Sequence, residues 1–261
     1  MKTTIACALA FALSTAGMIA FAQPTQTPAQ TFEPAVGQPG KDVVWVPTPQ
    51  ALVDKMLEMA KLTPTDYLID LGSGDGRTVI TAAKRGARAL GIEYDPNMVD
   101  LSRRNAKRDG VAERAEFVKA DLFETDLSRA DVITMFLLTS INLKLRPKIL
   151  SLKPGTRIVS NTFTMGDWEA DQKVTLDQRT GCEASYCTAL LWIVPAQIGG
   201  VHKTARGELT LKQQYQMVSG TLRVEGDMIP VQGKVVGQQL VLDAAGRELV
   251  GHVTDGRIEF R

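Results

Sequence analysis

Apolar and polar positions follow two different patterns along the chain. Between residues 43 and 195, short apolar runs alternate with stretches whose apolar residues recur every three or four positions. The apolar runs predict strands over 67–71, 88–93, 115–120, 131–137, 156–162, about 170–177 and about 187–194. The helical spacing predicts helices over 50–62, 77–85, 96–109 and 140–152.

The run at 132–138 has no polar–apolar alternation, which is typical of central parallel strands that are buried on both faces. Strands alternating with helices favour an α/β fold with a doubly wound, mostly parallel seven-stranded sheet. The last two strands are close in sequence, so a hairpin should join them. We expect this hairpin to place an antiparallel strand at the edge of the sheet.

After Pro195 the helical spacing disappears and apolar residues alternate with polar ones between turns. Pairs such as Leu209/Leu211 and Leu240/Leu242 indicate strands, and Asp255-Gly256 indicates a tight turn. The pattern predicts a small antiparallel β domain of about six strands over 196–261, after an α/β domain over 43–195. So small a domain buries little surface, so we expect it to pack on the α/β domain or to form an oligomer with a second copy.

The first 42 residues differ from both patterns. Residues 1–22 carry Lys2, an apolar run and the small-x-small sequence Ala20-Phe-Ala22, which predict a signal peptide and hence a periplasmic or secreted protein. A retained N-terminal anchor is the alternative interpretation. Residues 23–42, rich in Gln, Pro and Thr, predict a disordered leader. After cleavage we expect no stable membrane span.

Charge and cysteine content narrow the possible partners. Removing 1–22 leaves 29 Lys and Arg against 29 Asp and Glu, and a neutral chain without a basic tail is not expected to bind nucleic acid. The two remaining cysteines, Cys182 and Cys187, predict a disulfide in an exported protein, and two independent thiols are the alternative. Two such ligands without a nearby His do not predict a metal site.

The strongest chemical signal is the segment Leu68-Ile-Asp-Leu-Gly-Ser-Gly-Asp-Gly-Arg77. It is an apolar strand that runs into a glycine-rich turn before a helix, where a backbone without Cβ atoms can approach a ligand closely. Asp70 and Asp75 would repel a pyrophosphate but suit a ligand that carries an amine and a sulfonium. Arg77 stands where a dinucleotide-binding motif requires its third glycine.

Two further acids are predicted at neighbouring strand ends. Glu93 ends the second strand, about twenty residues beyond the glycines, where a carboxylate can accept both hydroxyls of a ribose. Asp121 follows the third strand and can accept an adenine amino group, with Leu122 beside the ring. Open α/β sheets bind ligands at this edge, so Asp70, Glu93 and Asp121 are expected to share one crevice.

These segments resemble motifs I, post-I and II of the seven-strand, Rossmann-like S-adenosylmethionine (AdoMet) methyltransferases. The resemblance implies AdoMet as cofactor, with Gly72, Gly74 and Gly76 at the methionine end, Glu93 at the ribose and Asp121 at the adenine. The predicted cofactor-binding set is Asp70, Gly72, Ser73, Gly74, Asp75, Gly76, Glu93, Asp121 and Leu122.

The flanking segments, Val46-Pro-Thr-Pro49 among them, resemble the small protein-lysine methyltransferases related to the enzyme that modifies the ATP-synthase c-subunit. The Asn-Pro-Pro-[Phe/Tyr] tetrad of many amine methyltransferases is absent at the end of the fourth strand. This chain has Met135-Phe-Leu-Leu-Thr139 there. Candidates for the acceptor side are Thr48, Phe136, Thr139, Asn142 and Asn161.

The combined prediction is an exported AdoMet-dependent methyltransferase that acts on a protein lysine or a small amine. Methyl transfer from a sulfonium is an in-line displacement that mainly requires positioning and exclusion of water, so no catalytic triad is expected. The alternative is a non-enzymatic protein that binds AdoMet or a related nucleoside and uses the β domain for interactions.

Overall fold

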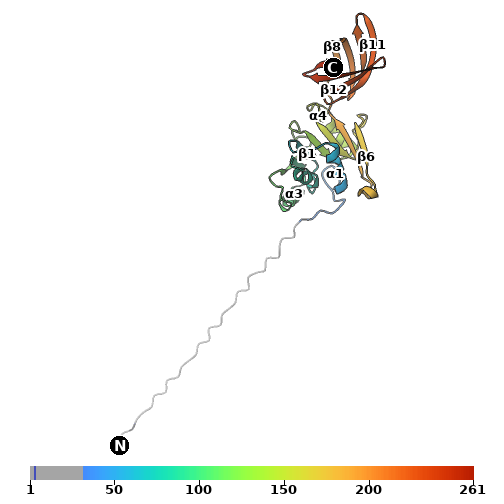
Figure 1. Cartoon of the computed structure of the whole chain (residues 1–261). Helices are drawn as coiled ribbons and strands as arrows, with labels where there is room; N and C mark the ends of the chain where they lie inside the picture. The colour runs from blue at the N-terminus through green and yellow to red at the C-terminus, as the bar shows by residue number, and fades with distance from the viewer. Residues whose placement is uncertain (1–2, 4–31) are drawn as a thin grey trace. The chain divides into compact units, whose positions relative to one another are not determined.

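The computed structural model describes residue 3 and residues 32–261 (Figure 1). Residues 32–261 belong to one unit. The predicted signal peptide over 1–22 and the first part of the predicted leader, 23–31, therefore lie outside the described residues, apart from Thr3. Among the residues described, no helix has both the length and the apolar character that a membrane crossing needs.

The first sheet has seven strands in the order β3-β2-β1-β4-β5-β7-β6. Its strands are β1 (Tyr67–Leu71), β2 (Arg88–Glu93), β3 (Ala115–Lys119), β4 (Val132–Met135), β5 (Arg157–Asn161), β6 (Gln172–Thr175) and β7 (Thr188–Ile193). Strands β1 to β5 pair in parallel. The order reverses between β1 and β4, which creates the crevice where sheets of this type bind ligands. The predicted doubly wound sheet is confirmed.

The predicted position of the antiparallel strand is wrong by one place. Strand β7 is antiparallel to both neighbours, but it lies between β5 and β6 instead of at the edge. The reason is burial, since Ala189–Trp192 in β7 are buried, whereas β6 is mostly exposed. The more apolar strand takes the inner position, and the polar strand Gln-Lys-Val-Thr takes the edge.

Helices cover both faces of this sheet. They are α1 (Gln50–Met59), α2 (Arg77–Lys84), α3 (Pro96–Arg108) and α4 (Thr139–Leu150). Helices α1, α2 and α3 pack on one face, where they share a core with Leu68 and Val132. Helix α4 packs on the other face with Ile69 and Ile133. Neighbouring residues in one strand thus serve opposite cores, which explains why these strands show no polar–apolar alternation.

The second sheet is antiparallel throughout and follows strand order along the chain. It consists of β8 (Gly200–Thr204), β9 (Gly207–Gln214), β10 (Met217–Val224), β11 (Asp227–Val236), β12 (Gln239–Ala244), β13 (Arg247–Thr254) and β14 (Arg257–Phe260), labelled in part in Figure 1. The end strands β8 and β14 contact each other, so the sheet nearly closes into a barrel around its own core.

The small antiparallel unit is confirmed, with seven strands instead of about six. Strand β8 has the weakest sequence pattern of the seven, because Gly200–Thr204 contains a single large apolar residue, Val201, and that residue is exposed. The boundary between the two predicted domains stays a prediction.

Trp168 joins the two sheets. Its ring is fully buried, lies 6.3 Å from the ring of Trp192, and stacks at 5.9 Å on Tyr215, which follows β9. The Tyr215 hydroxyl donates a hydrogen bond to Asp167, and the Lys234 ammonium lies 2.7 Å from a carboxylate oxygen of Asp171. The segment after β5 therefore contacts the second sheet through both apolar and charged groups.

Candidate functional site

A cleft of about 440 Å³ lies at the carboxyl ends of β1, β2, β3 and β4. Eight of the nine predicted cofactor-binding residues line it: Asp70, Gly72, Ser73, Gly74, Asp75, Glu93, Asp121 and Leu122. Two of the predicted acceptor-side residues, Thr48 and Phe136, line the same cleft. The structure thus brings three strand-end acids and part of the acceptor side into one cavity of ligand size.

The glycine-rich turn forms one wall of the cleft. Gly72 and Gly74 have φ angles of 76° and 55°, a region that favours glycine. A Cβ at Gly74 would lie 2.6 Å from Nε1 of Trp45, and the Gly74 carbonyl accepts a hydrogen bond from the buried Ser102 hydroxyl. Residue 74 therefore has no space for a side chain, and the hydrogen bond from Ser102 holds its backbone in place.

Gly76 has a packing role in the structure. It is absent from the residues that line the cleft. Its φ of 83° starts helix α2, and a Cβ there would lie 2.7 Å from the ring of Phe117. The close packing of helix on sheet therefore explains this glycine, and its contact with a cofactor stays a prediction.

Asp70 is the buried acid of the site. It is the next-to-last residue of strand β1 and is 6% exposed, and its Oδ1 accepts a 2.7 Å hydrogen bond from the Thr134 hydroxyl. Burial above all, together with the nearby carboxylates of Glu93 and Asp75, raises the pKa of the Asp70 carboxyl to about 7, although the hydrogen bond from Thr134 lowers it. A cation placed in the cleft would relieve this destabilisation.

Glu93 is held by the backbone of the glycine turn. Its Oε2 accepts a 2.9 Å hydrogen bond from the Gly74 N–H. Its Oε1 accepts from the N–H groups of Tyr94 and Asp95 at 2.7 and 3.0 Å. Three backbone donors fix the carboxylate at the cleft, and one lone pair, on Oε2, is left to accept from a ribose hydroxyl. Asp95 itself caps helix α3 by accepting from the Asn97 N–H at 2.8 Å.

Asp121 is paired with a residue that sequence reasoning did not select. The Lys41 ammonium lies 2.5 Å from Oδ2 of Asp121 and 4.6 Å from the centre of the Tyr94 ring. The hydrogen bond from Lys41 holds the pKa of the Asp121 carboxyl below its usual range. The Phe123 N–H donates to Oδ1. An adenine amino group would therefore meet a carboxylate that is already oriented.

Residues 38–46 cover the cleft, although the sequence assigned 38–42 to a disordered leader. Pro39 and Val44 form an antiparallel bridge, and the Trp45 N–H donates to the Gln38 carbonyl. The part of the predicted leader that the structure describes, 32–42, thus ends in a turn at the site. The composition of this segment gave no signal for that contact, because its partners are distant in sequence.

Asp75 and Thr48 are linked by one arginine. The Arg77 guanidinium binds both oxygens of Asp75 and donates a 2.9 Å hydrogen bond to the Thr48 carbonyl. Asp75 therefore faces the cleft with its charge already paired. The same arginine fixes the Pro-Thr-Pro segment against the glycine-rich turn.

The remaining acceptor candidates are absent from the cleft lining. Asn161 is fully buried and donates a 3.3 Å hydrogen bond to the Thr48 hydroxyl. Asn142 is also fully buried and donates to the carbonyl oxygens of Phe163 and Thr164. Neither lines the cleft, nor does Thr139 at the start of α4. Asn142 and Asn161 position their neighbours, and their direct contact with an acceptor stays a prediction.

Two aromatic residues of the cleft were missed by sequence reasoning. Phe163 follows β5 and Tyr186 precedes β7, and both line the cleft beside Phe136. No sequence motif marks them, because they come together only through the order of β4, β5 and β7 in the sheet.

The comparisons with known proteins agree with this geometry. Residues 70–172 match the ANTKMT methyltransferase domain. A protein-lysine N-methyltransferase of Saccharolobus islandicus is 44% identical over 138 residues, which are 52% of this chain and 86% of that protein. The chain belongs to this family of AdoMet-dependent methyltransferases. The human lysine N-methyltransferase that is named for the ATP synthase c-subunit is 30% identical over 59% of this methyltransferase and 70% of its own length.

A solved structure carries the cofactor assignment. The RNA methyltransferase of Salinibacter ruber in complex with S-adenosyl-L-homocysteine is 49% identical, with a TM-score of 0.54, and the match covers 59% of this methyltransferase and 96% of that chain. The cofactor of this methyltransferase is AdoMet, as predicted. The matched family domain ends at residue 172, so the second sheet lies outside it.

The residues present fit AdoMet. The cleft offers a buried carboxylate of raised pKa for a cationic group, a wall without Cβ atoms for close backbone approach, and an oriented glutamate for a ribose. Asp70, Gly72 and Gly74 would hold the methionine end, Glu93 the ribose, and Asp121 with Leu122 the adenine.

Proposed function

We propose that this methyltransferase transfers the methyl group of AdoMet to the ε-amine of lysine side chains in proteins, outside the cytoplasm. The observation that carries the proposal is the shared cleft, in which the acids at the ends of β1 to β3 adjoin Thr48 and the aromatic residues at the ends of β4 and β5. The names of the relatives from Saccharolobus islandicus and Homo sapiens support lysine as the acceptor class.

The chemistry requires positioning more than acid–base catalysis. When bound, AdoMet supplies a methyl group on a positively charged sulfur; the lone pair of the amine nitrogen forms the N–C bond as the C–S bond breaks, and the nitrogen then releases a proton to solvent. Asp70 offsets positive charge at the methionine end. The half-buried wall around Phe136 disfavours the charged form of a lysine and so promotes the neutral nucleophile.

Thr48 is the polar group best placed to orient the acceptor. Its hydroxyl oxygen, in a residue only 8% exposed, accepts from Asn161, which leaves its own proton and a second lone pair toward the cleft. The backbone of Thr48 is fixed by Arg77. A hydroxyl held in this way can accept an N–H of the incoming amine and direct its lone pair to the methyl group.

Export is supported by the predicted signal peptide and by the disulfide between Cys182 and Cys187, since disulfides persist in oxidising compartments. Fractionation of cells that express the full chain tests this part. We expect the protein in the periplasm or medium, with an N-terminus at Gln23. A cytoplasmic protein that retains residues 1–22 would contradict it.

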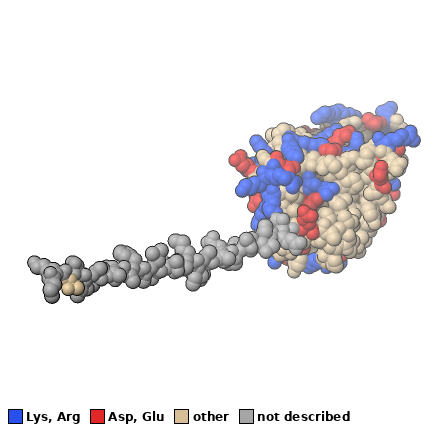
Figure 2. Space-filling view, turned by 90° about the horizontal axis from the view of Figure 1, so that it is seen from below, with Lys and Arg blue, Asp and Glu red and all other residues tan. Residues whose placement is uncertain are grey.

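RNA is a second candidate acceptor because the 49% identical Salinibacter ruber protein is titled an RNA methyltransferase. The neutral charge of the mature chain argues against it. Acidic and basic side chains are interspersed on the face drawn in Figure 2, in keeping with that balance.

One assay separates these acceptors. Purified protein is incubated with methyl-labelled AdoMet and a periplasmic extract, and the products are treated with protease or ribonuclease. We expect label in protein, with methyl-lysine released by acid hydrolysis and no transfer by Glu93→Ala. Label that only ribonuclease removes would establish RNA as the acceptor, and AdoMet binding without any transfer would establish a non-enzymatic binder.

A further inference from the structure

Three aromatic rings from separate parts of the sheet meet at the cleft. The ring centres of Phe136 and Phe163 are 5.9 Å apart, those of Phe136 and Tyr186 5.4 Å, and those of Phe163 and Tyr186 6.4 Å. Such distances are those of rings in contact. All three line the same cleft as Thr48 and Asp70. They form an aromatic cluster beyond the ends of β4 and β5, on the acceptor side of the site.

Tyr186 is the outer member of this cluster. It is 38% exposed, whereas Phe136 and Phe163 are half-buried. Tyr186 belongs to the segment 183–186, whose four residues are all exposed and therefore have little packing of their own. Apart from the contacts of the Tyr186 ring with Phe136 and Phe163, the position of this segment depends on its two ends.

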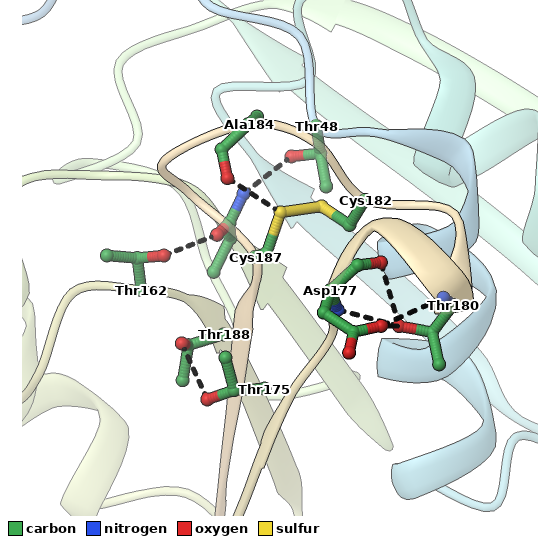
Figure 3. The surroundings of a disulfide bond; sticks show 10 residues. Thr48, Thr162, Thr175, Asp177, Thr180, Cys182, Ala184, Cys187 and Thr188 are labelled. Atoms are coloured by element: carbon green, nitrogen blue, oxygen red, sulfur yellow. Dashed lines mark hydrogen bonds between the residues drawn. A yellow bond between two sulfur atoms is a disulfide. The ribbon is translucent and has the colours of Figure 1, made fainter.

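The Cys182–Cys187 disulfide supplies that constraint. Both cysteines are buried, with 3% and 5% exposed, in the core that α1 shares with the sheet. The bridge ties the two ends of 183–186 together at a Cα–Cα distance of 6.0 Å (Figure 3). Gly181 lies against Ala51 of α1, where an added Cβ would come within 3.2 Å of the Ala51 Cβ. Tyr186 therefore directly precedes Cys187, whose position the disulfide fixes.

We propose that the disulfide-closed loop 182–187 is part of the acceptor site, in which Tyr186, Phe136 and Phe163 receive the long aliphatic amine of a lysine side chain. This proposal rests on the proposed function and deepens it. The ring walls bury the methylene groups of the lysine side chain, whose apolar surface leaves water on contact. The bridge positions Tyr186 for this contact without taking part in the reaction.

The loop makes acceptor binding sensitive to redox conditions. Dithiothreitol reduces the bridge to two thiols and is itself oxidised to a cyclic disulfide, so no other reductant is needed in the test. Opening the bridge removes the covalent link between the two ends of 183–186. Tyr186 then spends part of its time away from Phe136. The hydrogen bonds that hold Asp70, Glu93 and Asp121 come from Thr134, Gly74 and Phe123, and neither cysteine takes part in them.

Steady-state kinetics with the protein fraction of a periplasmic extract as acceptor test the proposal. For Tyr186→Ala we expect an apparent KM for the acceptor about tenfold higher, with kcat and the Kd of AdoMet changed less than twofold. Tyr186→Phe should keep the ring and most of the affinity. Ser185→Ala, in the same exposed loop but outside the cleft lining, is the matched control and should leave all three values unchanged.

Reduction provides the second arm. Dithiothreitol should raise the acceptor KM of the wild type by a similar factor, while circular dichroism shows that the reduced protein stays folded. A Cys182→Ser/Cys187→Ser variant already lacks the bridge, so dithiothreitol should not change its KM. If that variant does not fold, the comparison of oxidised with reduced wild type carries this arm alone. An unchanged KM in Tyr186→Ala, or an equal rise in Ser185→Ala, would overturn the proposal. Wild-type protein that binds AdoMet but labels no protein would instead refute the proposed function itself.

Discussion

Replacing Asp70 by Asn should make the protein more stable and a weaker binder of AdoMet. Burial raises the pKa of this carboxyl from 3.8 to about 7. Between about pH 4 and pH 7 the folded chain holds a proton that the unfolded chain has released, so the free energy of unfolding falls as the pH rises through this window. At 1.36 kcal/mol per pKa unit, the full cost above pH 7 is about 4 kcal/mol.

The neutral amide avoids this cost and can still accept the hydrogen bond from Thr134. We therefore expect Asp70→Asn to gain about 2–4 kcal/mol at pH 8, or about 5–10 °C in Tm, and to gain nothing at pH 4. Calorimetric scans of both proteins from pH 4 to pH 8 measure this. Asp75→Asn is the matched control, because it removes a carboxylate already paired with Arg77 and should give no gain.

The same variant should bind AdoMet at least tenfold more weakly, since it lacks the charge that faces the cationic end of the ligand. The reasoning is refuted if Asp70→Asn is less stable than the wild type at pH 8, or if its gain is the same at pH 4 and pH 8. It is also refuted if the variant binds AdoMet as tightly as the wild type, because the buried charge would then serve no ligand.

Three further changes test a helix–sheet contact, an ion pair at the amino ends of the strands and an ion pair at the cleft. Gly76→Ala should cost at least about 2 kcal/mol in urea unfolding, because a Cβ there meets the Phe117 ring at 2.7 Å and φ is positive; a neutral effect would show that helix α2 shifts freely. Arg157→Ala should cost about 3–5 kcal/mol because it leaves the mostly buried Asp66 carboxylate unpaired, and an equal loss with Asp66→Asn added would contradict that cause. Lys41→Ala breaks a partly exposed ion pair and should change the Kd of AdoMet less than about threefold by calorimetry; a loss above tenfold would make Lys41 a principal binding residue.

Most of the first sheet follows from local sequence. Apolar runs such as 132–135 are too short and too continuous for helices, and the glycine turn at 72–76 marks the carboxyl end of the sheet. Each strand in this sheet begins and ends within two residues of its predicted bounds. The acids Asp70, Glu93 and Asp121 could be placed in one cleft because parallel strands bring their carboxyl ends to one edge.

The acceptor side could not be predicted in the same way. Phe163 meets Phe136 because β5 pairs with β4, and Tyr186 meets both because β7 lies beside β5; nothing local to either residue encodes that order. Lys41 pairs with Asp121 across 80 positions of sequence. Asn142 and Asn161 lie at the edge of the sheet where the sequence predicted them. Both are buried, however, and they donate hydrogen bonds to the Phe163 carbonyl and the Thr48 hydroxyl.

Titration calorimetry of the purified protein with AdoMet tests the central claim most directly, namely that the acid-lined cleft at the ends of β1, β2 and β3 binds this cofactor. We predict one site per chain with micromolar affinity, and at least tenfold weaker binding for Glu93→Ala, which loses the carboxylate held by Gly74 but keeps its fold by circular dichroism. Wild-type protein that gives no binding heat, or Glu93→Ala that binds as tightly as the wild type, would contradict it.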